Sequence, residues 1–347
     1  FSWEAGQRAE ALGICQNEVD LFNSWLKENE PESVVEVHSQ QTVSTKTKKI
    51  IFQLTKNIPA NTEAYSLSVR ENEIRLTSAT TEGIFRGSQT LKQLLPGYYT
   101  TNASFKSFEI PSMDISDAPA FPHRGMLLDC GRHFMDVATV KKYIDALAFY
   151  KMNVLHWHLT EDQGWRIEIK KYPELTRLGS YRMDKFGNHV SEGYYTQEQI
   201  KDIVAYAQAR HVTIIPEIEM PGHSVAAISA YPWLSCTGES IPVETEWGVF
   251  KDIYCAGNDS TIQFLKDVMD EVCSLFPSKY IHIGGDEAPK FRWEHCPKCQ
   301  NRMHKHGLKN EMELQTWLIE EMAEYLHTKG KQIIGWDEIL EGGIPAE

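Results

Sequence analysis

The sequence has little positive charge and no long apolar run. Its 35 Lys and Arg residues against 48 Asp and Glu residues give a net charge of -13, and no dense Lys/Arg block offers a face for phosphates, so nucleic acid is not an expected partner. No apolar run reaches the roughly 18 residues that a membrane-spanning helix needs. Residues 1–30 also lack the basic, apolar and small-residue order of a signal peptide, and we therefore expect a soluble mature chain without a membrane span.

Seven cysteines, an odd number, do not specify a complete disulfide framework. The pattern Cys-x-x-Cys at 296–299, followed by His304 and His306 and with His295 adjacent, has some zinc-site spacing, but a single such pair is weak evidence. We favour a loop that is reduced or pinned by a disulfide, with Cys236 and Cys255 as a candidate second pair. Structural zinc stays the alternative.

Residues 1–112 are expected to form a small α+β domain. Helical spacing of apolar residues at 17–29 and 81–95 brackets short β-rich runs at 34–38, 49–54, 64–69 and 73–78. The segment 96–120 is rich in Pro, Ser and Asp, and we place the domain boundary within it.

Residues 113–347 follow a different pattern, in which short apolar strands alternate with longer amphipathic helices. Such alternation is typical of a parallel sheet or a (β/α) barrel, and it assigns the chain to the α/β class. The expected strands lie at 124–129, 153–159, 212–219, 280–285 and 332–336, and the expected helices near 137–151, 197–210, 260–275 and 311–328.

Polar residues stand at the end of each expected strand. They are Asp129, His158 to Asp162, Glu219 to His223, Asp286-Glu287 and Asp337-Glu338. Because the carboxyl ends of barrel strands share one face, these separate clusters should converge on one pocket.

Residues 281–289 read Ile-His-Ile-Gly-Gly-Asp-Glu-Ala-Pro, and this string resembles the active-site motif of glycoside hydrolase family 20, the β-N-acetylhexosaminidases. Four further motifs stand in the family's order: Arg124-Gly125, Trp-His-Leu-Thr-Glu-Asp-Gln-Gly-Trp at 157–165, Glu-Ile-Glu-Met-Pro-Gly-His at 217–223 and Gly-Trp-Asp-Glu at 335–338. The resemblance implies a (β/α)8 TIM-type barrel after a small α+β domain. It also implies an exo-acting retaining hydrolase of terminal, non-reducing β-GlcNAc or β-GalNAc in glycans, with no cofactor and no catalytic metal.

The resemblance implies roles for four residues. Glu287 protonates the leaving oxygen and later deprotonates water, and Asp286 holds the 2-acetamido N–H of the substrate. The acetamido oxygen then attacks C1 and forms an oxazolinium intermediate, so the enzyme belongs to the substrate-assisted glycosidases. His223 and Asp162 form a network behind the acid, which must hold its proton near the working pH.

The residue types themselves favour two tasks for the paired carboxylates. Neighbouring side chains on a strand point to opposite faces, so Asp286 and Glu287 are poor candidates for one shared task.

Three further residues are expected to bind the sugar. The fork of Arg124 suits two vicinal outer hydroxyls, although a structural ion pair with a carboxylate such as Asp129 is the competing interpretation. Trp336 resembles a pocket tryptophan that stacks on the sugar or walls the acetamido group, and a core position is its alternative. His158, at the end of the second expected strand, completes the predicted set.

Two other classes of protein compete with this hypothesis. His156, His158, His223, His282 and Asp286 could be drawn as the ligands of a metal-dependent hydrolase in a similar barrel. A noncatalytic sugar-binding module is disfavoured because both central carboxylates are intact.

Five expected strands are fewer than the eight that close a TIM barrel. We therefore expect residues 1–347 to form an open barrel whose edge strands expose unpaired N–H and C=O groups, and which is not a competent enzyme alone. The expected location is secreted, periplasmic or at the cell surface.

Overall fold

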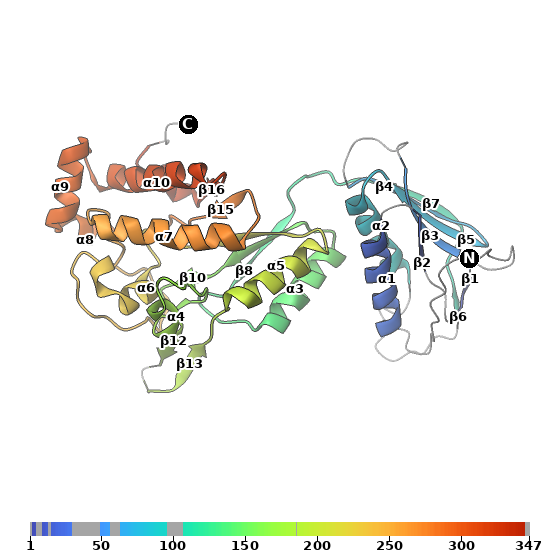
Figure 1. Cartoon of the computed structure of the whole chain (residues 1–347), viewed down its shortest axis with the longest axis horizontal. Helices are drawn as coiled ribbons and strands as arrows, with labels where there is room; N and C mark the ends of the chain where they lie inside the picture. The colour runs from blue at the N-terminus through green and yellow to red at the C-terminus, as the bar shows by residue number, and fades with distance from the viewer. Residues whose placement is uncertain are drawn as a thin grey trace. The chain divides into compact units, whose positions relative to one another are not determined.

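The computed structural model divides the chain into two compact units, one built mainly from residues 1–124 and the other mainly from 125–347 (Figure 1). It describes residues 2–4, 9–12, 15–29, 49–55, 63–95, 107–184 and 186–343. The strand expected at 34–38 lies outside the described residues. Among the described helices, none has the length and apolarity that crossing a membrane requires.

The first unit packs two helices on a mixed five-stranded sheet. The sheet order is β2 (Ala9–Leu12), β3 (Lys49–Leu54), β5 (Glu73–Ser78), β4 (Tyr65–Val69) and β7 (Met113–Asp117), the helices are α1 (Gln16–Asn29) and α2 (Thr81–Leu94), and β1 (Ser2–Glu4) pairs separately with β6 (Ser107–Glu109). Alternate residues of β4 and β5 are buried, as expected for a sheet with one covered face. β7 pairs with β4, so this sheet extends past the boundary expected at residue 112.

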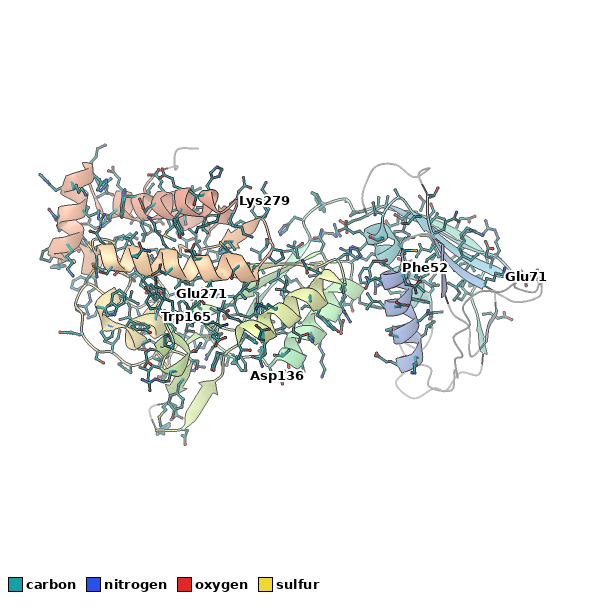
Figure 2. The ribbon with its side chains drawn as sticks, viewed as in Figure 1. Phe52, Glu71, Asp136, Trp165, Glu271 and Lys279 are labelled. Carbon is teal, nitrogen blue, oxygen red and sulfur yellow. The ribbon has the colours of Figure 1, made fainter. Side chains whose placement is uncertain are left out.

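Phe52 shows how the core of the first unit is made. It comes from β3 and is fully buried, and its ring centroid lies 5.4 Å from that of Phe22 on α1. Figure 2 shows Phe52 inside the unit, whereas Glu71 lies at its margin, in the exposed turn before β5.

The second unit contains a five-stranded parallel sheet whose strand order follows the chain. The strands are β8 (Gly125–Asp129), β9 (Val154–His158), β14 (Thr213–Glu217), β15 (Tyr280–His282) and β16 (Gln332–Ile334), and the long intervening helices are α3 (Val137–Phe149), α5 (Gln197–Gln208), α7 (Asp259–Leu275) and α10 (Glu311–Thr328). Each expected strand and helix of this region is present. α5 packs on α7 and α7 on α10, which Figure 1 shows as neighbouring ribbons.

Shorter elements were not expected from the sequence. They are the two-residue strands β10 (Thr160–Glu161) and β11 (Gly164–Trp165), the hairpin of β12 (Tyr181–Met183) and β13 (His189–Glu192), and the helices α4 (Glu174–Arg177), α6 (Val225–Ala230), η2 (Pro232–Leu234), α8 (Phe291–Glu294), α9 (Pro297–His306) and η3 (Asp337–Leu340). Most lie in the segments that follow the carboxyl ends of the parallel strands, where loops carry function in parallel α/β folds.

Candidate active site

The carboxyl ends of the five parallel strands lie in register. Asp129 pairs with His158, His158 with Glu217, Glu217 with His282, and His282 with Ile334. One row of residues therefore crosses the sheet, and the segments that follow it form one site.

Glu217 is the buried carboxylate at the centre of this row. Its Oε1 lies 2.9 Å from Nδ1 of His282 and accepts a hydrogen bond of 3.0 Å from Nε1 of Trp336. Its Oε2 lies 2.8 Å from Nε2 of His156 and 3.3 Å from Nδ1 of His158. Burial alone would raise the pKa of Glu217, but the hydrogen bonds with His156 and His282 outweigh it and lower the pKa far below its usual range.

Glu219, two residues later, has the opposite environment. It is fully buried, and neither carboxyl oxygen has a hydrogen-bond partner among the described residues. Burial and the negative charges of Glu217 and Asp286 raise its pKa well above its usual range, so this site favours the protonated form of Glu219. A Cβ at Gly284 would lie 1.7 Å from its Oε2, which requires glycine at that position.

His223 joins two pairs of carboxylates. Its Nδ1 lies 3.1 Å from Oε1 of Glu161 and 3.2 Å from Oδ2 of Asp162, and its Nε2 lies 3.6 Å from Oδ2 of Asp286 and 3.5 Å from Oε2 of Glu287. Burial would lower the pKa of His223, but hydrogen bonds with Asp162, Asp286 and Glu161 raise it far above its usual value. His223 is therefore an imidazolium, and the structure brings together the four residues expected at the chemical centre.

The backbone at Asp286 and Glu287 corrects the argument from strand alternation. Neither residue belongs to a strand, and Glu287 has a φ of 46° in the left-handed region. This turn follows Gly284 and Gly285, and it directs both carboxylates toward the same nitrogen of His223. The expectation that the two side chains point to opposite faces is therefore wrong, because strand geometry ends before them.

Arg124 does not lie at the strand ends. It precedes β8, at the amino end of that strand, and its guanidinium binds both carboxyl oxygens of Glu63 and the carbonyl oxygens of Phe121 and Lys151. The predicted position of Arg124 in the pocket is therefore wrong. The ion-pair alternative describes it, although with Glu63 in place of Asp129.

Arg132 is the arginine that follows the carboxyl end of β8. Its guanidinium lies 2.5 Å from Oε1 of Glu161 and 2.7 Å from Oδ2 of Asp129, and it stacks 5.2 Å from the ring centroid of Trp247. The side chain is 23% exposed. Sequence reasoning missed Arg132, although its place just beyond Asp129 is the signal that identified the other clusters.

His158 and Trp336 differ in their exposure to solvent. His158 is buried, and its Nε2 lies 2.9 Å from the carbonyl oxygen of Thr160, so this imidazole packs inside the protein against the segment that follows β9. Trp336 is 36% exposed while its N–H donates to Glu217. A flat ring that is fixed at one edge and open to solvent suits contact with a sugar face.

Glu287 is half exposed and lines a hollow of about 300 Å3. Gln315, buried on α10, reaches the same loop and donates a 2.7 Å hydrogen bond from its side chain to the carbonyl oxygen of Gly285. The loop that carries Asp286 and Glu287 is thus held from α10, while the carboxyl group of Glu287 remains accessible.

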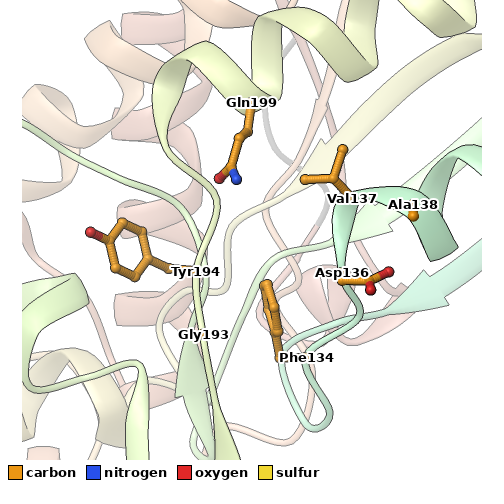
Figure 3. Close-up of a pocket in the computed structure, with 7 residues that line it drawn as sticks. All are labelled: Phe134, Asp136, Val137, Ala138, Gly193, Tyr194 and Gln199. Atoms are coloured by element: carbon orange, nitrogen blue, oxygen red, sulfur yellow. The ribbon is translucent and has the colours of Figure 1, made fainter.

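A second hollow of about 480 Å3 lies away from these residues, where the start of α3 faces the start of α5 (Figure 3). Phe134 and Asp136 line it from one side and Tyr194 and Gln199 from the other. The carboxylate of Asp136 accepts the backbone N–H of Thr139 and so caps α3. This hollow shares no residue with the cluster around His223.

The histidines of the metal hypothesis divide between separate groups. His156 and His282 share Glu217, with donor atoms within 4.8 Å of one another, whereas His223 groups with Asp286 and the other carboxylates around it. The N–O distances of 2.8 and 2.9 Å at Glu217 bring both imidazoles into direct contact with its carboxylate.

Two accessible carboxylates against one buried imidazolium can bind and transfer protons, which is the chemistry of acid–base hydrolases. Comparison with known proteins identifies the family. The model of the glycosyl hydrolase family 20 catalytic domain matches residues 121–347, and the model of domain 2 of that family matches residues 11–118. The chain belongs to glycosyl hydrolase family 20, which confirms the resemblance seen in the sequence.

Individual relatives agree with this assignment. A beta-hexosaminidase of Porphyromonas gingivalis is 50% identical over 83% of this chain and 37% of its own length, and one of Vibrio furnissii is 36% identical over 99% of this chain and 55% of its own. The chain thus spans about half the length of the curated relatives it matches, or less.

Solved structures of the family share the fold. The exo beta-N-acetylglucosaminidase of Vibrio harveyi, in complex with N-acetylglucosamine, matches with a TM-score of 0.85 and 32% sequence identity. The match covers 100% of this chain and 54% of the Vibrio harveyi chain. The beta-N-acetylhexosaminidase of Bacteroides fragilis has a TM-score of 0.81 at 39% identity, over 98% of this chain and 64% of its own. These neighbours imply a TIM-type barrel domain after a small N-terminal domain.

Proposed function

We propose that the protein is an exo-acting, retaining β-N-acetylhexosaminidase that removes terminal β-GlcNAc or β-GalNAc by substrate-assisted catalysis. The observation that carries the proposal is the position of His223, whose ring contacts Glu161 and Asp162 through Nδ1 and faces both Asp286 and Glu287 through Nε2. The family relationship supports the same reaction.

The two carboxylates divide the chemistry by their exposure. Glu287 is 50% exposed and can reach the glycosidic oxygen as acid and then water as base. Asp286 is 22% exposed and lies deeper, where it can accept the acetamido N–H of the substrate. The acetamido oxygen then attacks C1, the bond from C1 to the leaving oxygen breaks, and the leaving group takes the proton of Glu287. Water returns the intermediate to the β-product and Glu287 to its acid form.

The sugar itself is held by two side chains that flank this pair. Trp336 offers its partly exposed ring, and Arg132 offers N–H groups at the end of β8 for outer hydroxyls. Because Arg132 already pairs with two carboxylates, its fork is fixed before substrate arrives.

Kinetics of the full-length protein test these roles. Glu287→Gln should lower kcat/KM about 100- to 10,000-fold on substrates with poor leaving groups and much less on activated aryl glycosides, which need little acid assistance. Asp286→Asn should slow both kinds of N-acetyl substrate, and a thiazoline mimic of the oxazolinium should bind the parent protein tightly. Glu294→Gln, an exposed glutamate on α8, is the matched control and should leave the rates unchanged.

Two outcomes would contradict the mechanism. A covalent sugar ester on Asp286 or Glu287 would replace the oxazolinium by an enzyme-bound intermediate. Equal rates on a β-glucoside and a β-N-acetylglucosaminide would show that the acetamido group is not needed, and loss of activity in chelator would favour the metal-dependent alternative.

We propose further that the five parallel strands are consecutive strands of a (β/α)8 barrel, which their chain-order pairing supports. That five strands alone make no competent enzyme, and that the protein acts outside the cytoplasm, both stay predictions.

A further inference from the structure

Four of the seven cysteines form one cluster in the second unit, away from the residues of the proposed reaction. Sγ of Cys255 lies 3.7 Å from Sγ of both Cys296 and Cys299, and Sγ of Cys236 lies 3.7 Å from Sγ of Cys299. All four sulfurs lie within 4.8 Å of one another. Cys255, Cys296 and Cys299 are buried, and Cys236 is partly buried.

The spacing of the sulfurs is that of a metal tetrathiolate. Disulfides join sulfurs in pairs at about 2.05 Å, whereas Cys255 has two sulfur neighbours at equal distance. A tetrahedral zinc site with Zn–S bonds of about 2.3 Å has sulfur–sulfur edges of about 3.8 Å. We propose that Cys236, Cys255, Cys296 and Cys299 bind one structural Zn2+ ion. Binding displaces the thiol protons to solvent and transfers no electrons.

The Cys-x-x-Cys half of the site is built on the start of α9. Cys296 is the N-cap of this helix, Pro297 is its first residue, and Cys299 lies in its first turn. Spacing of this kind lets two sulfurs bind one ion without a change in the backbone.

The other half of the site comes from a short antiparallel bridge. Ser235 pairs with Tyr254, and the N–H of Cys255 donates a 2.8 Å hydrogen bond to the carbonyl oxygen of Leu234. The bridge therefore presents Cys236 and Cys255, the residues that follow each of its partners, to the start of α9.

Gly257 brings the two halves together. Its backbone N–H donates a hydrogen bond to the sulfur of Cys255, which favours the thiolate. A Cβ at Gly257 would lie 2.2 Å from the backbone nitrogen of Cys299, so a larger residue would push α9 away from the bridge. The close approach that glycine allows therefore keeps the bridge against the start of α9.

The histidines in the zinc-like spacing of the sequence are not part of the cluster. His304 and His306 are exposed on α9, and His295 is exposed with its Nδ1 2.8 Å from the carbonyl oxygen of Phe291. The two remaining ligands come from about 40 and 60 residues upstream, as the sequence separations of 41 and 63 in the sulfur contacts show.

The proposed ion would join the segments that follow β14 and β15. Tyr254 donates its N–H to the carbonyl oxygen of Pro221, beside His223, and accepts a 2.9 Å hydrogen bond from Nε1 of Trp293, in the helix after Glu287. Zinc would thus fix the loops that carry the proposed chemistry without touching substrate, and its removal should loosen both.

Metal content of the purified full chain tests the site directly. We expect about one zinc per chain by elemental analysis, its release when a mercurial blocks the thiols, and a cobalt-substituted protein with the visible bands of a tetrahedral cobalt thiolate. Cys299→Ser should reduce the zinc content at least about tenfold. Cys273→Ser, a free cysteine on α7 outside the cluster, is the matched control and should retain the metal.

Thiol counting on the same unmodified protein keeps the test decisive if Cys299→Ser does not fold. With zinc bound, all seven cysteines should react after denaturation in chelator. Two disulfides would leave three reactive thiols and overturn the proposal, and seven reactive thiols without any bound metal would overturn it equally.

Discussion

His223 offers the sharpest test of the electrostatics of the site, because this buried side chain lies among four carboxylates. Replacing His223 by Gln removes a cation that is 2% exposed and leaves Glu161 and Asp162, 1% and 2% exposed, without it. Breaking a buried ion pair by removing one partner costs about 3–5 kcal/mol. Arg132 still pairs with Glu161 in the variant, so we expect a loss of about 3 kcal/mol in the free energy of unfolding.

The pH dependence of this loss has a definite sign. Burial would lower the pKa of His223, but the hydrogen bonds with Asp162, Asp286 and Glu161 raise it above that of the unfolded chain, which is about 6.5. Above that pH the folded state keeps a proton that the unfolded state has lost. The stabilisation from His223 is therefore complete below about pH 6.5 and declines as the pH rises toward the folded pKa, by about 1.4 kcal/mol per pH unit.

Urea unfolding of the wild type, His223→Gln and His327→Gln between about pH 6 and pH 8 measures this slope. His327 is exposed in the last turn of α10 and serves as the control. The free energy of unfolding of the wild type and of His327→Gln should fall with pH more steeply than that of His223→Gln, by about 1.4 kcal/mol per unit. Equal slopes in all three proteins would refute the reasoning, because His223 would then not be a buried imidazolium.

Three further substitutions test the geometry. Gly284→Ala should lower the free energy of unfolding by about 3 kcal/mol or more, because its Cβ would meet a buried carboxyl group at 1.7 Å. Gly330→Ala is the control, since Gly330 has a similar φ but nothing within 4 Å, and it should lower the free energy of unfolding by about 1–2 kcal/mol. Chemical denaturation compares the two variants. Arg132→Ala should lower kcat/KM about tenfold or more. Arg124→Ala should instead lower the free energy of unfolding and leave the kinetics of the folded fraction unchanged. Trp336→Phe keeps a flat ring but removes the N–H donated to a buried carboxylate, so thermal denaturation should show a loss of about 1.5–3 kcal/mol.

The fold of the second unit could be predicted because its strands are short apolar runs and its helices long amphipathic ones. The helix expected at 311–328 is α10, Glu311–Thr328, with the same ends, since Asn310 accepts the N–H of Glu313 as an N-cap. Local capping of this kind is visible in a sequence. By contrast, β7 lies within the segment 96–120 where only a domain boundary is expected, because a five-residue strand beside prolines gives too weak a signal against the loop composition around it.

The site was predicted less completely, for two reasons. Arg124 and Arg132 flank the same strand, and only knowledge of where β8 begins and ends decides which of them reaches the carboxyl face. The left-handed Glu287 is the second reason. Non-glycine residues enter that region when tertiary contacts hold them there, and residue types alone do not reveal such contacts.

Two buried glutamates of the site, Glu217 and Glu219, have pKa values shifted in opposite directions. Glu217 faces two imidazoles and an indole N–H at 2.8 to 3.0 Å, and these contacts keep it ionised in spite of burial. Neither carboxyl oxygen of Glu219 has a hydrogen-bond partner among the described residues, and burial together with the charges of Glu217 and Asp286 raises its pKa well above its usual range. Because its surroundings oppose ionisation, Glu219 is disfavoured as a further negative charge near Asp286, the carboxylate that accepts the acetamido N–H in the proposed mechanism.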